Sequence, residues 1–391
     1  MIVRVENLNI YMPHAQTWSR KEFIHYALEI LGHVETLLGF RYGDWTRLLR
    51  ENRFSIDRKY WKRVASVTLM SLATSKDKRK EDNQYAELYS QVQVKNPIFI
   101  IGHWRSGTTL IHTLLSQDTR FAYPNLFQVT HPHTFLIREE MVNKILANNS
   151  AEKRHMDNMR ITFKSPGEDE PALAVMSLRS AQIGWLFPNN FKHYERYLSF
   201  DDAADEDLER WKAALTTFSR KLTFRYNRPI LFKSPTHTAK IRILLDLFPD
   251  ARFVHIYRDP YKVFQSTKNM YEKVLPDACL QEVNFSSLDN LIVRQHRLIY
   301  DAYFRDVGLL ASNRVVDICY EELIEDKIGQ VRKIYETLEL PEFSIAEPSL
   351  KEYIESVAGY KKNPYPDLRP EERRFIAQNW ERSFDIWGYP V

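Results

Sequence analysis

The sequence predicts an α/β protein built on a P-loop-type parallel sheet with helices on both faces and a helical extension at its N-terminus. Short apolar runs of strand length recur along the chain, and a helical pattern follows them. A glycine-containing turn separates the first run from its helix. The 391 residues exceed the usual size of a single core. We therefore expect a helical extension over residues 1–95 and a main domain over residues 96–391.

The composition is that of a globular protein in a reducing compartment. Hydrophobic residues make up 44% of the chain and charged residues 27%. The two cysteines, Cys279 and Cys319, provide no disulfide framework. No apolar run approaches the roughly 18 residues that cross a bilayer, and residues 1–10 lack the apolar core of a secretory signal. These features predict a cytoplasmic protein.

The extension is expected to be helical over residues 20–95. Its first helix shows apolar residues at three- and four-residue spacing, which marks one buried face. These residues are Phe23, Ala27, Ile30, Val34 and Leu37. Lys76–Asp82 is a charge cluster without apolar anchors, which favours a loop or linker.

The extension is also the basic part of the chain. Residues 1–95 hold sixteen Lys and Arg against eleven Asp and Glu, whereas the whole chain has a net charge of only +4. Such a balance does not predict a nucleic-acid partner. Arg41–Arg63 mixes cations with aromatic residues. Two interpretations remain open: a solvated helical face that packs its aromatics on the main domain, or an interfacial element in peripheral contact with a membrane.

Four apolar runs are the expected strands of the main domain. Because strands and helices alternate, the strands should be parallel, with helices on both faces of the sheet. The runs are Pro97–Ile101, Arg228–Lys233, Ala251–Tyr257 and Arg314–Cys319.

Gly102–Gly107 has the G-x-x-x-x-G spacing of a phosphate-binding loop between a buried strand and a helix. Backbone N–H groups of such a loop, with the helix N-terminus, bind an anion. A nucleoside triphosphatase needs Lys after the second glycine, but this chain has Thr108 there and carries its cation inside the loop, at Arg105. This arrangement favours one phosphate-like group over a triphosphate with magnesium.

The segment around this loop resembles the 5′-phosphosulfate loop of sulfotransferases that use 3′-phosphoadenosine 5′-phosphosulfate (PAPS). Phe253–Ser266 resembles the strand and helix with which that family binds the 3′-phosphate. The resemblance extends over residues 96–391 and is strongest to the broad bacterial group. It implies that several residues bind the donor nucleotide: Arg105, Ser106, Gly107, Thr108, Thr109, Arg258, Ser266, Tyr320, Lys361 and Lys362.

The resemblance implies an enzyme that moves a sulfuryl group from PAPS to a hydroxyl or amine of a small-molecule, lipid or glycan acceptor. The product would be 3′-phosphoadenosine 5′-phosphate (PAP). Like phosphoryl transfer, the reaction depends on positioning and on preorganised positive charge. Arg105 and Lys233 are the expected cations of the transition state. No residue cluster has the spacing of zinc ligands, and no metal is expected.

The acceptor also needs a general base. Many members of the family carry a Glu shortly after the phosphate loop, but the comparable position here is Gln128, which cannot take a proton. Glu170 is the first candidate, since clustered carboxylates raise each other's pKa. Glu168 and His237 are the alternatives. The acidic residues could instead form a solvated turn, and His237 could be a buried packing residue.

Two other functions compete with this interpretation. A P-loop kinase of a small molecule would require ATP and magnesium. A non-catalytic adaptor would have kept the nucleotide fold without turnover.

Overall fold

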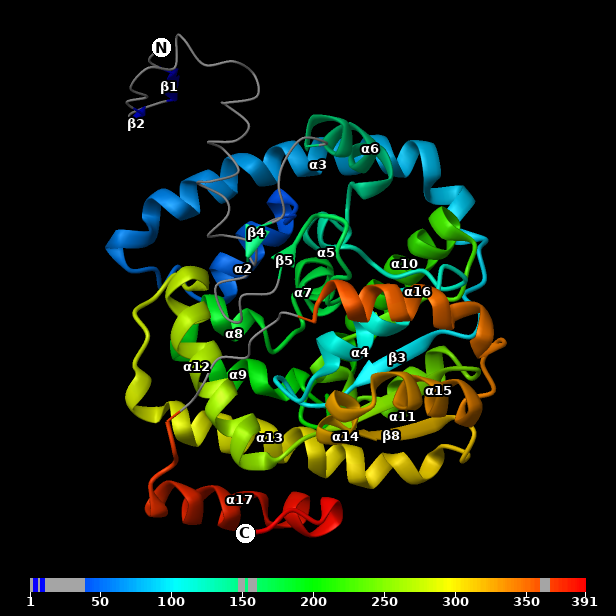
Figure 1. Ribbon diagram of the computed structural model, residues 1–391. Coiled ribbons are helices and arrows are strands. Elements are labelled where there is room, and N and C mark those ends of the chain that lie inside the picture. Colours follow the sequence, from blue (N-terminus) through cyan, green and yellow to red (C-terminus); the bar gives the residue numbers. More distant parts are fainter. Residues whose placement is uncertain (1–2, 6–7, 11–38, 147–151, 154–159, 359–365) are drawn as a thin grey trace.

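The computed structural model describes residues 3–5, 8–10, 39–146, 152–153, 160–358 and 366–391 (Figure 1). The expected helix from Phe23 to Leu37 lies outside the described residues. The α-helices are α2 Tyr42–Glu51, α3 Trp61–Ser90, α4 Thr108–Leu115, α5 Leu126–Thr130, α6 Phe135–Leu146, α7 Glu170–Ser177, α8 Ile183–Leu186, α9 Phe191–Tyr194, α10 Asp205–Tyr226, α11 Ile241–Leu247, α12 Pro260–Ala278, α13 Leu288–Asp306, α14 Tyr320–Glu325, α15 Lys327–Thr337, α16 Phe343–Ser356 and α17 Pro370–Trp387.

The central sheet has four parallel strands in the order β6-β3-β7-β8. They are β3 Ile98–Ile101, β6 Leu231–Lys233, β7 Arg252–Tyr257 and β8 Val315–Cys319. The four strands expected from the sequence are thereby confirmed. Two short antiparallel pairs lie apart from this sheet in the topology: β1 Val3–Val5 with β2 Leu8–Ile10, and β4 Glu152–Lys153 with β5 Arg160–Ile161.

Helices cover both faces of the sheet, as the α/β class predicts. Successive side chains of a strand point to opposite faces, so Ile98 and Ile100 join a cluster with α4, α14, α15 and α16. Phe99 and Ile101 join a second cluster with α10, α11 and α13 on the other face. A third cluster holds α12, α13 and α17 together. The inner strand β3 is therefore buried on both sides, which explains its continuous apolar sequence. On the edge strand β8, Asp317 is exposed.

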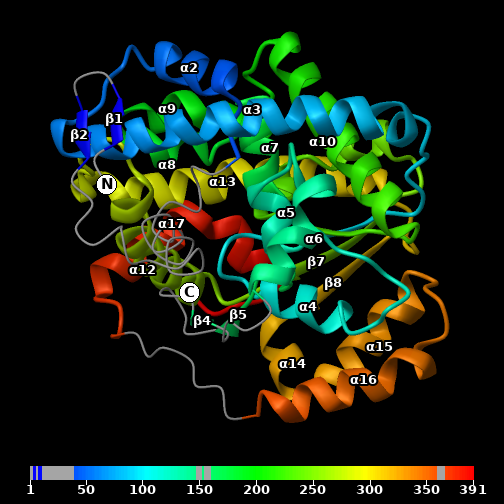
Figure 2. The ribbon, with the colours of Figure 1, turned by 90° about the horizontal axis from the view of Figure 1, so that it is seen from above.

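The helices α2 and α3 pack side by side over one end of the molecule, where α3 runs past α10 (Figure 2). The indole of Trp45 in α2 donates to the Thr68 hydroxyl of α3 at 2.9 Å. Trp45 and Val64 are buried in the same hydrophobic cluster as Phe99 of the central sheet. The inner face of this layer thus belongs to the core that supports the sheet.

The prediction of a loop at Lys76–Asp82 was wrong, because α3 continues through the whole segment. Several of its charges form ion pairs, whereas Lys76 and Arg79 are exposed. Lys78 forms an ion pair with Asp82 one turn later, and Glu81 pairs with Lys221 of α10 at 2.5 Å. The last two side chains are almost fully buried. Lys221 is distant from Glu81 in the sequence, so the local charge pattern does not reveal this buried pair.

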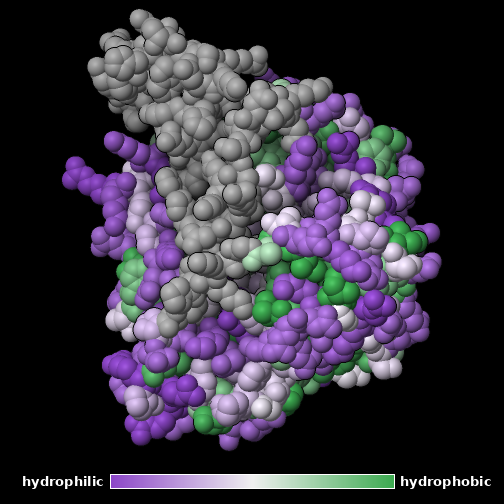
Figure 3. All heavy atoms as spheres, viewed as in Figure 1, coloured by the Kyte–Doolittle hydropathy of each residue, from purple (hydrophilic) through white to green (hydrophobic). Residues whose placement is uncertain are grey.

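The face seen in Figure 3 is largely hydrophilic, with hydrophobic side chains in smaller groups. Among the described residues, no helix combines the length and the apolar character needed to cross a bilayer.

Candidate active site

The loop after β3 has the backbone of an anion cradle. Gly102 has φ +139°, and a Cβ there would lie 2.3 Å from the carbonyl oxygen of Ile256. Gly107 has φ +110°, and its Cβ would lie 2.5 Å from the ring of Tyr320. Arg105 between them adopts φ 70°, a left-handed conformation that costs free energy in a residue with a side chain and is concentrated at functional sites.

Hydrogen bonds hold the loop in this shape. The Gly102 N–H donates to the Thr238 hydroxyl at 2.7 Å, and the His103 N–H donates to the Tyr300 hydroxyl at 3.2 Å. Ser106 is buried, and its hydroxyl donates to the His103 carbonyl at 2.7 Å. Thr108 and Thr109 open α4, so their backbone N–H groups belong to the helix turn that has no internal acceptors. The backbone N–H groups of Thr108 and Thr109 are therefore the donors that this turn offers to an anion.

The strand β7 ends at Tyr257, and the next residue, Arg258, contacts this loop. The Asp259 side chain caps α12 by accepting from the Tyr261 N–H at 2.8 Å, and Pro260 occupies the first helical turn. The Arg258 guanidinium lies 4.2 Å from the ring centroid of Tyr320, a cation–π contact. Tyr320 begins α14 directly after β8. The carboxyl ends of neighbouring parallel strands thus bring the two motifs and Tyr320 to one edge of the sheet.

Arg105 connects the loop to the second motif. Its Nε donates to the Ser266 hydroxyl of α12 at 2.9 Å, and its carbonyl oxygen accepts from Nη1 of Arg258 at 3.2 Å. The two arginines therefore belong to one site. The buried Nε of Arg258 has no hydrogen-bond partner among the described residues. A buried guanidinium nitrogen is costly without an acceptor, and a phosphate oxygen would satisfy it.

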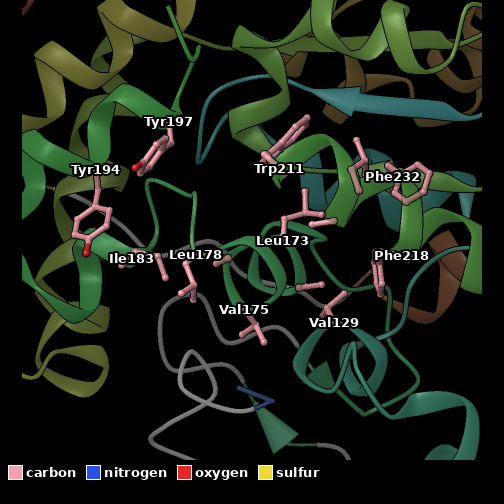
Figure 4. Close-up of a cluster of buried hydrophobic side chains, with 14 of the residues drawn as sticks. Val129, Leu173, Val175, Leu178, Ile183, Tyr194, Tyr197, Trp211, Phe218 and Phe232 are labelled. Carbon is pink, nitrogen blue, oxygen red and sulfur yellow. The ribbon is translucent and has the colours of Figure 1, made fainter. Parts of the chain in front are cut away.

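The acidic segment lies at the start of α7. Side chains of α7 pack against α5 and α10 in the hydrophobic cluster of Figure 4, where Leu173 and Val175 lie near Trp211, Phe218 and Val129. This packing fixes the N-terminal end of α7. Asp169 makes two hydrogen bonds with the end of β6. Its backbone N–H donates to the Lys233 carbonyl, and its side-chain carboxylate accepts from the Lys233 N–H at 3.0 Å.

Lys233 and Glu168 form an ion pair at this edge. The Lys233 ammonium lies 2.7 Å from the Glu168 carboxylate, and the sheet register sets Lys233 opposite Ile100 of β3. The Glu168 side chain is 21% exposed, and its Oε1 has no hydrogen-bond partner among the described residues. Burial raises the pKa of Glu168, although Lys233 opposes the shift. Burial, with Lys233 close by, lowers the pKa of His112 in α4 to about 3.

Glu170 lies deeper than Glu168. It is fully buried, and its carboxylate accepts hydrogen bonds from three hydroxyls at 2.5–3.2 Å. The donors are Ser180, Ser234 and Thr236. Such a carboxylate stabilises the turns that surround it.

His237 is also fully buried. Its Nε2 lies 2.5 Å from the Asp169 carboxylate, and its ring packs edge-on against Phe99 and Trp211. Although burial opposes it, the contact with His237 lowers the pKa of Asp169. Sequence reasoning did not single out Asp169, which joins β6, His237 and the acidic turn. In the sequence, only its position between the candidate bases Glu168 and Glu170 could have pointed to a role for Asp169 at the site.

The structure brings together most of the residues expected at the site. Lys361 and Lys362 lie outside the described residues. Among the described residues, no group of three or more His, Cys, Asp and Glu side chains could hold a metal ion.

Comparisons with known proteins give consistent results. The profile of the sulfotransferase family matches residues 97–344. The chain is 34% identical over 353 residues, 90% of either chain, to the omega-hydroxy-beta-dihydromenaquinone-9 sulfotransferase Stf3 of Mycobacterium bovis and of Mycobacterium tuberculosis. Sulfotransferase STF9 from Mycobacterium avium has a TM-score of 0.67 at 20% identity, covering 96% of this chain and 98% of its own. STF1 from M. tuberculosis has a TM-score of 0.60 at 16% identity, covering 93% and 98%. These two structures establish the same fold.

Proposed function

The chain belongs to the sulfotransferase family and is a PAPS-dependent sulfotransferase, and we propose that its acceptor is the hydroxyl of an apolar lipid. Family membership favours this enzyme over the kinase and the adaptor. The Stf3 proteins support the choice of acceptor, because their name specifies a hydroxylated menaquinone and they align with 90% of this chain. We therefore assign to the acceptor of this chain a terminal hydroxyl on a long apolar chain, the feature that the name of the Stf3 acceptor indicates.

The donor nucleotide fits the residues at the sheet edge. The loop N–H groups with Thr108 and Thr109 would hold the 5′-phosphate, and Arg258 with Ser266 would hold the 3′-phosphate. The observation that carries this assignment is the contact of Arg105 with both Arg258 and Ser266. The donor supplies an activated sulfuryl group on a phosphate leaving group. Charge that develops on this leaving oxygen needs fixed cations nearby, and Lys233 has that role in the proposal. The Arg105 side chain instead contacts Ser266, at the end of the site assigned to the 3′-phosphate.

We assign the general base to Glu168. Of the three candidates, Glu170 and His237 are fully buried, whereas the Glu168 side chain is partly exposed. Oε2 of Glu168 pairs with Lys233, whereas Oε1 is buried and has no hydrogen-bond partner among the described residues, so Oε1 is the oxygen that would take the proton of the acceptor hydroxyl. A raised pKa makes a carboxylate a better base near neutral pH. In this assignment Glu170 supports the site structurally, and Asp169 positions the segment beside Lys233.

The donor assignment predicts the effect of Arg258→Ala on nucleotide binding. Calorimetry should show that the wild-type protein binds PAP without magnesium. Loss of the Arg258 guanidinium should weaken this binding about 100-fold, because a phosphate loses two charge-assisted hydrogen bonds. The matched control is Arg374→Ala at an exposed position of α17, which should bind PAP as the wild type does. Equal affinity of Arg258→Ala and the control would refute the donor assignment.

The acceptor assignment predicts a preference among hydroxyl compounds. With PAPS as donor, an isoprenoid quinone carrying a terminal hydroxyl should have a kcat/KM at least roughly tenfold above that of its analogue shortened by several isoprene units, because each buried methylene adds favourable transfer free energy. Simple phenols and monosaccharides serve as the comparison. Turnover of a phenol or sugar as efficient as that of the long-chain alcohol would contradict a lipid acceptor.

A further inference from the structure

The outer face of the N-terminal helix layer is strongly cationic. Between residues 41 and 80, nine Lys and Arg side chains are exposed: Arg47, Arg50, Arg53, Arg58, Lys59, Lys62, Lys76, Arg79 and Lys80. Glu51 is the one exposed acidic residue in this range, and it pairs with Arg179. Of the nine cations, only Lys59 and Lys80 form ion pairs among the described residues.

Two of the acidic residues of α3 face the opposite way. Asp77 and Glu81 are buried, and they pair with Arg138 of α6 and Lys221 of α10, respectively. Positive and negative charges are therefore segregated across the helix. The outer face keeps a net positive charge even though the helix as a whole contains several acids.

Large apolar side chains lie among these cations. Trp61, Leu69 and Leu72 of α3 are each about half exposed, at 48%, 48% and 49%. Lys76 follows Leu72 by four residues, and Arg79 follows Lys76 by three. Together with the steps of eight and three residues that join Trp61, Leu69 and Leu72, this spacing places all five side chains along one stripe of the helix. An exposed apolar stripe next to cations is unusual on a face that only meets water.

Phe54 extends this surface at the turn between α2 and α3. It is 50% exposed and has φ 51°, and Arg53 before it has φ 54°. Left-handed backbone costs free energy in an aromatic residue and persists only where its surroundings fix it. Here the next residues are tied down: Gln281 donates to the Ser55 carbonyl at 2.8 Å, and the Asp57 N–H donates to the Leu280 carbonyl at 3.1 Å.

We propose that the outer face of α2 and α3 docks the enzyme on membranes that contain anionic lipids. Cations attract the lipid headgroups, while exposed Trp, Phe and Leu side chains enter the region between headgroups and acyl chains. A nucleic-acid phosphate backbone would use the cations but would leave the apolar stripe in water, so the membrane fits better. This inference goes beyond the proposed function, because docking needs neither donor nor acceptor.

The test is flotation of the full-length protein with vesicles, without PAPS or acceptor. The protein should float with phosphatidylcholine vesicles containing about 30% phosphatidylglycerol and much less with phosphatidylcholine alone. Raising NaCl from about 0.05 M to about 0.5 M should release it, since salt screens exposed charges. The double variant Lys76→Glu/Arg79→Glu should bind the anionic vesicles at least about tenfold more weakly. Trp61→Ser should weaken binding several-fold by removing an apolar anchor.

The matched control is Arg297→Glu/Arg374→Glu on α13 and α17, which lie on the opposite side of the molecule from α3 (Figure 1). It makes the same change in net charge and should keep wild-type vesicle binding. Unchanged thermal unfolding and PAP affinity would show that the α3 variants are folded, and would separate failure of docking from failure of the enzyme assignment. The proposal would be overturned if the protein floated equally with neutral and anionic vesicles. It would also be overturned if the control variant lost as much vesicle binding as the α3 variant. Tighter binding to a single-stranded oligonucleotide than to anionic vesicles would overturn it too.

Discussion

The variant Glu168→Gln should lose kcat by a factor of about 10²–10⁴, which is the usual contribution of a positioned general base. Gln has the same shape and can still accept a hydrogen bond from Lys233, but it cannot take the acceptor's proton. Binding of PAP, measured by calorimetry, should remain near the wild-type value, because Glu168 is assigned to the acceptor side of the site.

The dependence of the rate on pH provides a second readout for Glu168. A general base acts when it is unprotonated, and burial raises the pKa of this carboxyl above its usual range. The wild-type kcat/KM should therefore rise as pH increases through that raised pKa. The residual activity of Glu168→Gln should lack this rise. If Glu168 had only a structural role, the variant would be less active but kcat/KM would still rise with pH.

Glu170→Gln is the comparison that tells the two carboxylates apart. Because Glu170 is fully buried and accepts three hydroxyl hydrogen bonds, its replacement should lower the free energy of unfolding by about 1–3 kcal/mol. The folded fraction should keep the wild-type pH profile. If Glu170→Gln loses the acidic limb of this profile while Glu168→Gln keeps it, the base has been assigned to the wrong residue.

Lys233→Met should reduce kcat by about 10²–10³, which is typical for loss of one preorganised donor at a developing negative charge. It should also change the pH profile. The ammonium of Lys233 lowers the pKa of Glu168 against the effect of burial, so its removal should raise that pKa further. The rise of kcat/KM should then occur at higher pH than in the wild type.

The control for Lys233→Met is Lys351→Met. Lys351 forms an ion pair with Glu347 at 2.9 Å on the exposed side of α16, far from the loop in sequence. Removal of this surface pair should leave both kcat and the pH profile unchanged. A Lys233→Met enzyme with wild-type kcat would exclude Lys233 from the stabilisation of the leaving group.

The sheet could be predicted because its signals are local. The strands β3 and β6 are short segments buried on both faces. The two glycines of the loop have positive φ angles, and their spacing in the sequence already suggested such a turn. The meeting of Arg105 with Arg258 and Ser266 was implied by family resemblance. It arises physically because parallel neighbouring strands end at the same edge.

The choice among the acidic residues could not be predicted. Glu168 and Glu170 are two positions apart, and their different burial depends on how α7 packs against α5 and α10. The hydroxyls that enclose Glu170 come from two separate segments of the chain. The prediction of a loop at the charge cluster of α3 was wrong for the same reason, since Glu81 pairs with Lys221 on α10, a helix distant in the sequence.

Arg105 gives the two ends of the donor site a common support. Its side chain contacts the residue expected at the 3′-phosphate, while its own carbonyl holds Arg258 and its neighbours form the cradle for the 5′-phosphate. The two ends therefore cannot shift independently. A donor that fills only one of them still has to organise the other, so free energies measured for separate fragments of the nucleotide will not sum to the affinity of the whole.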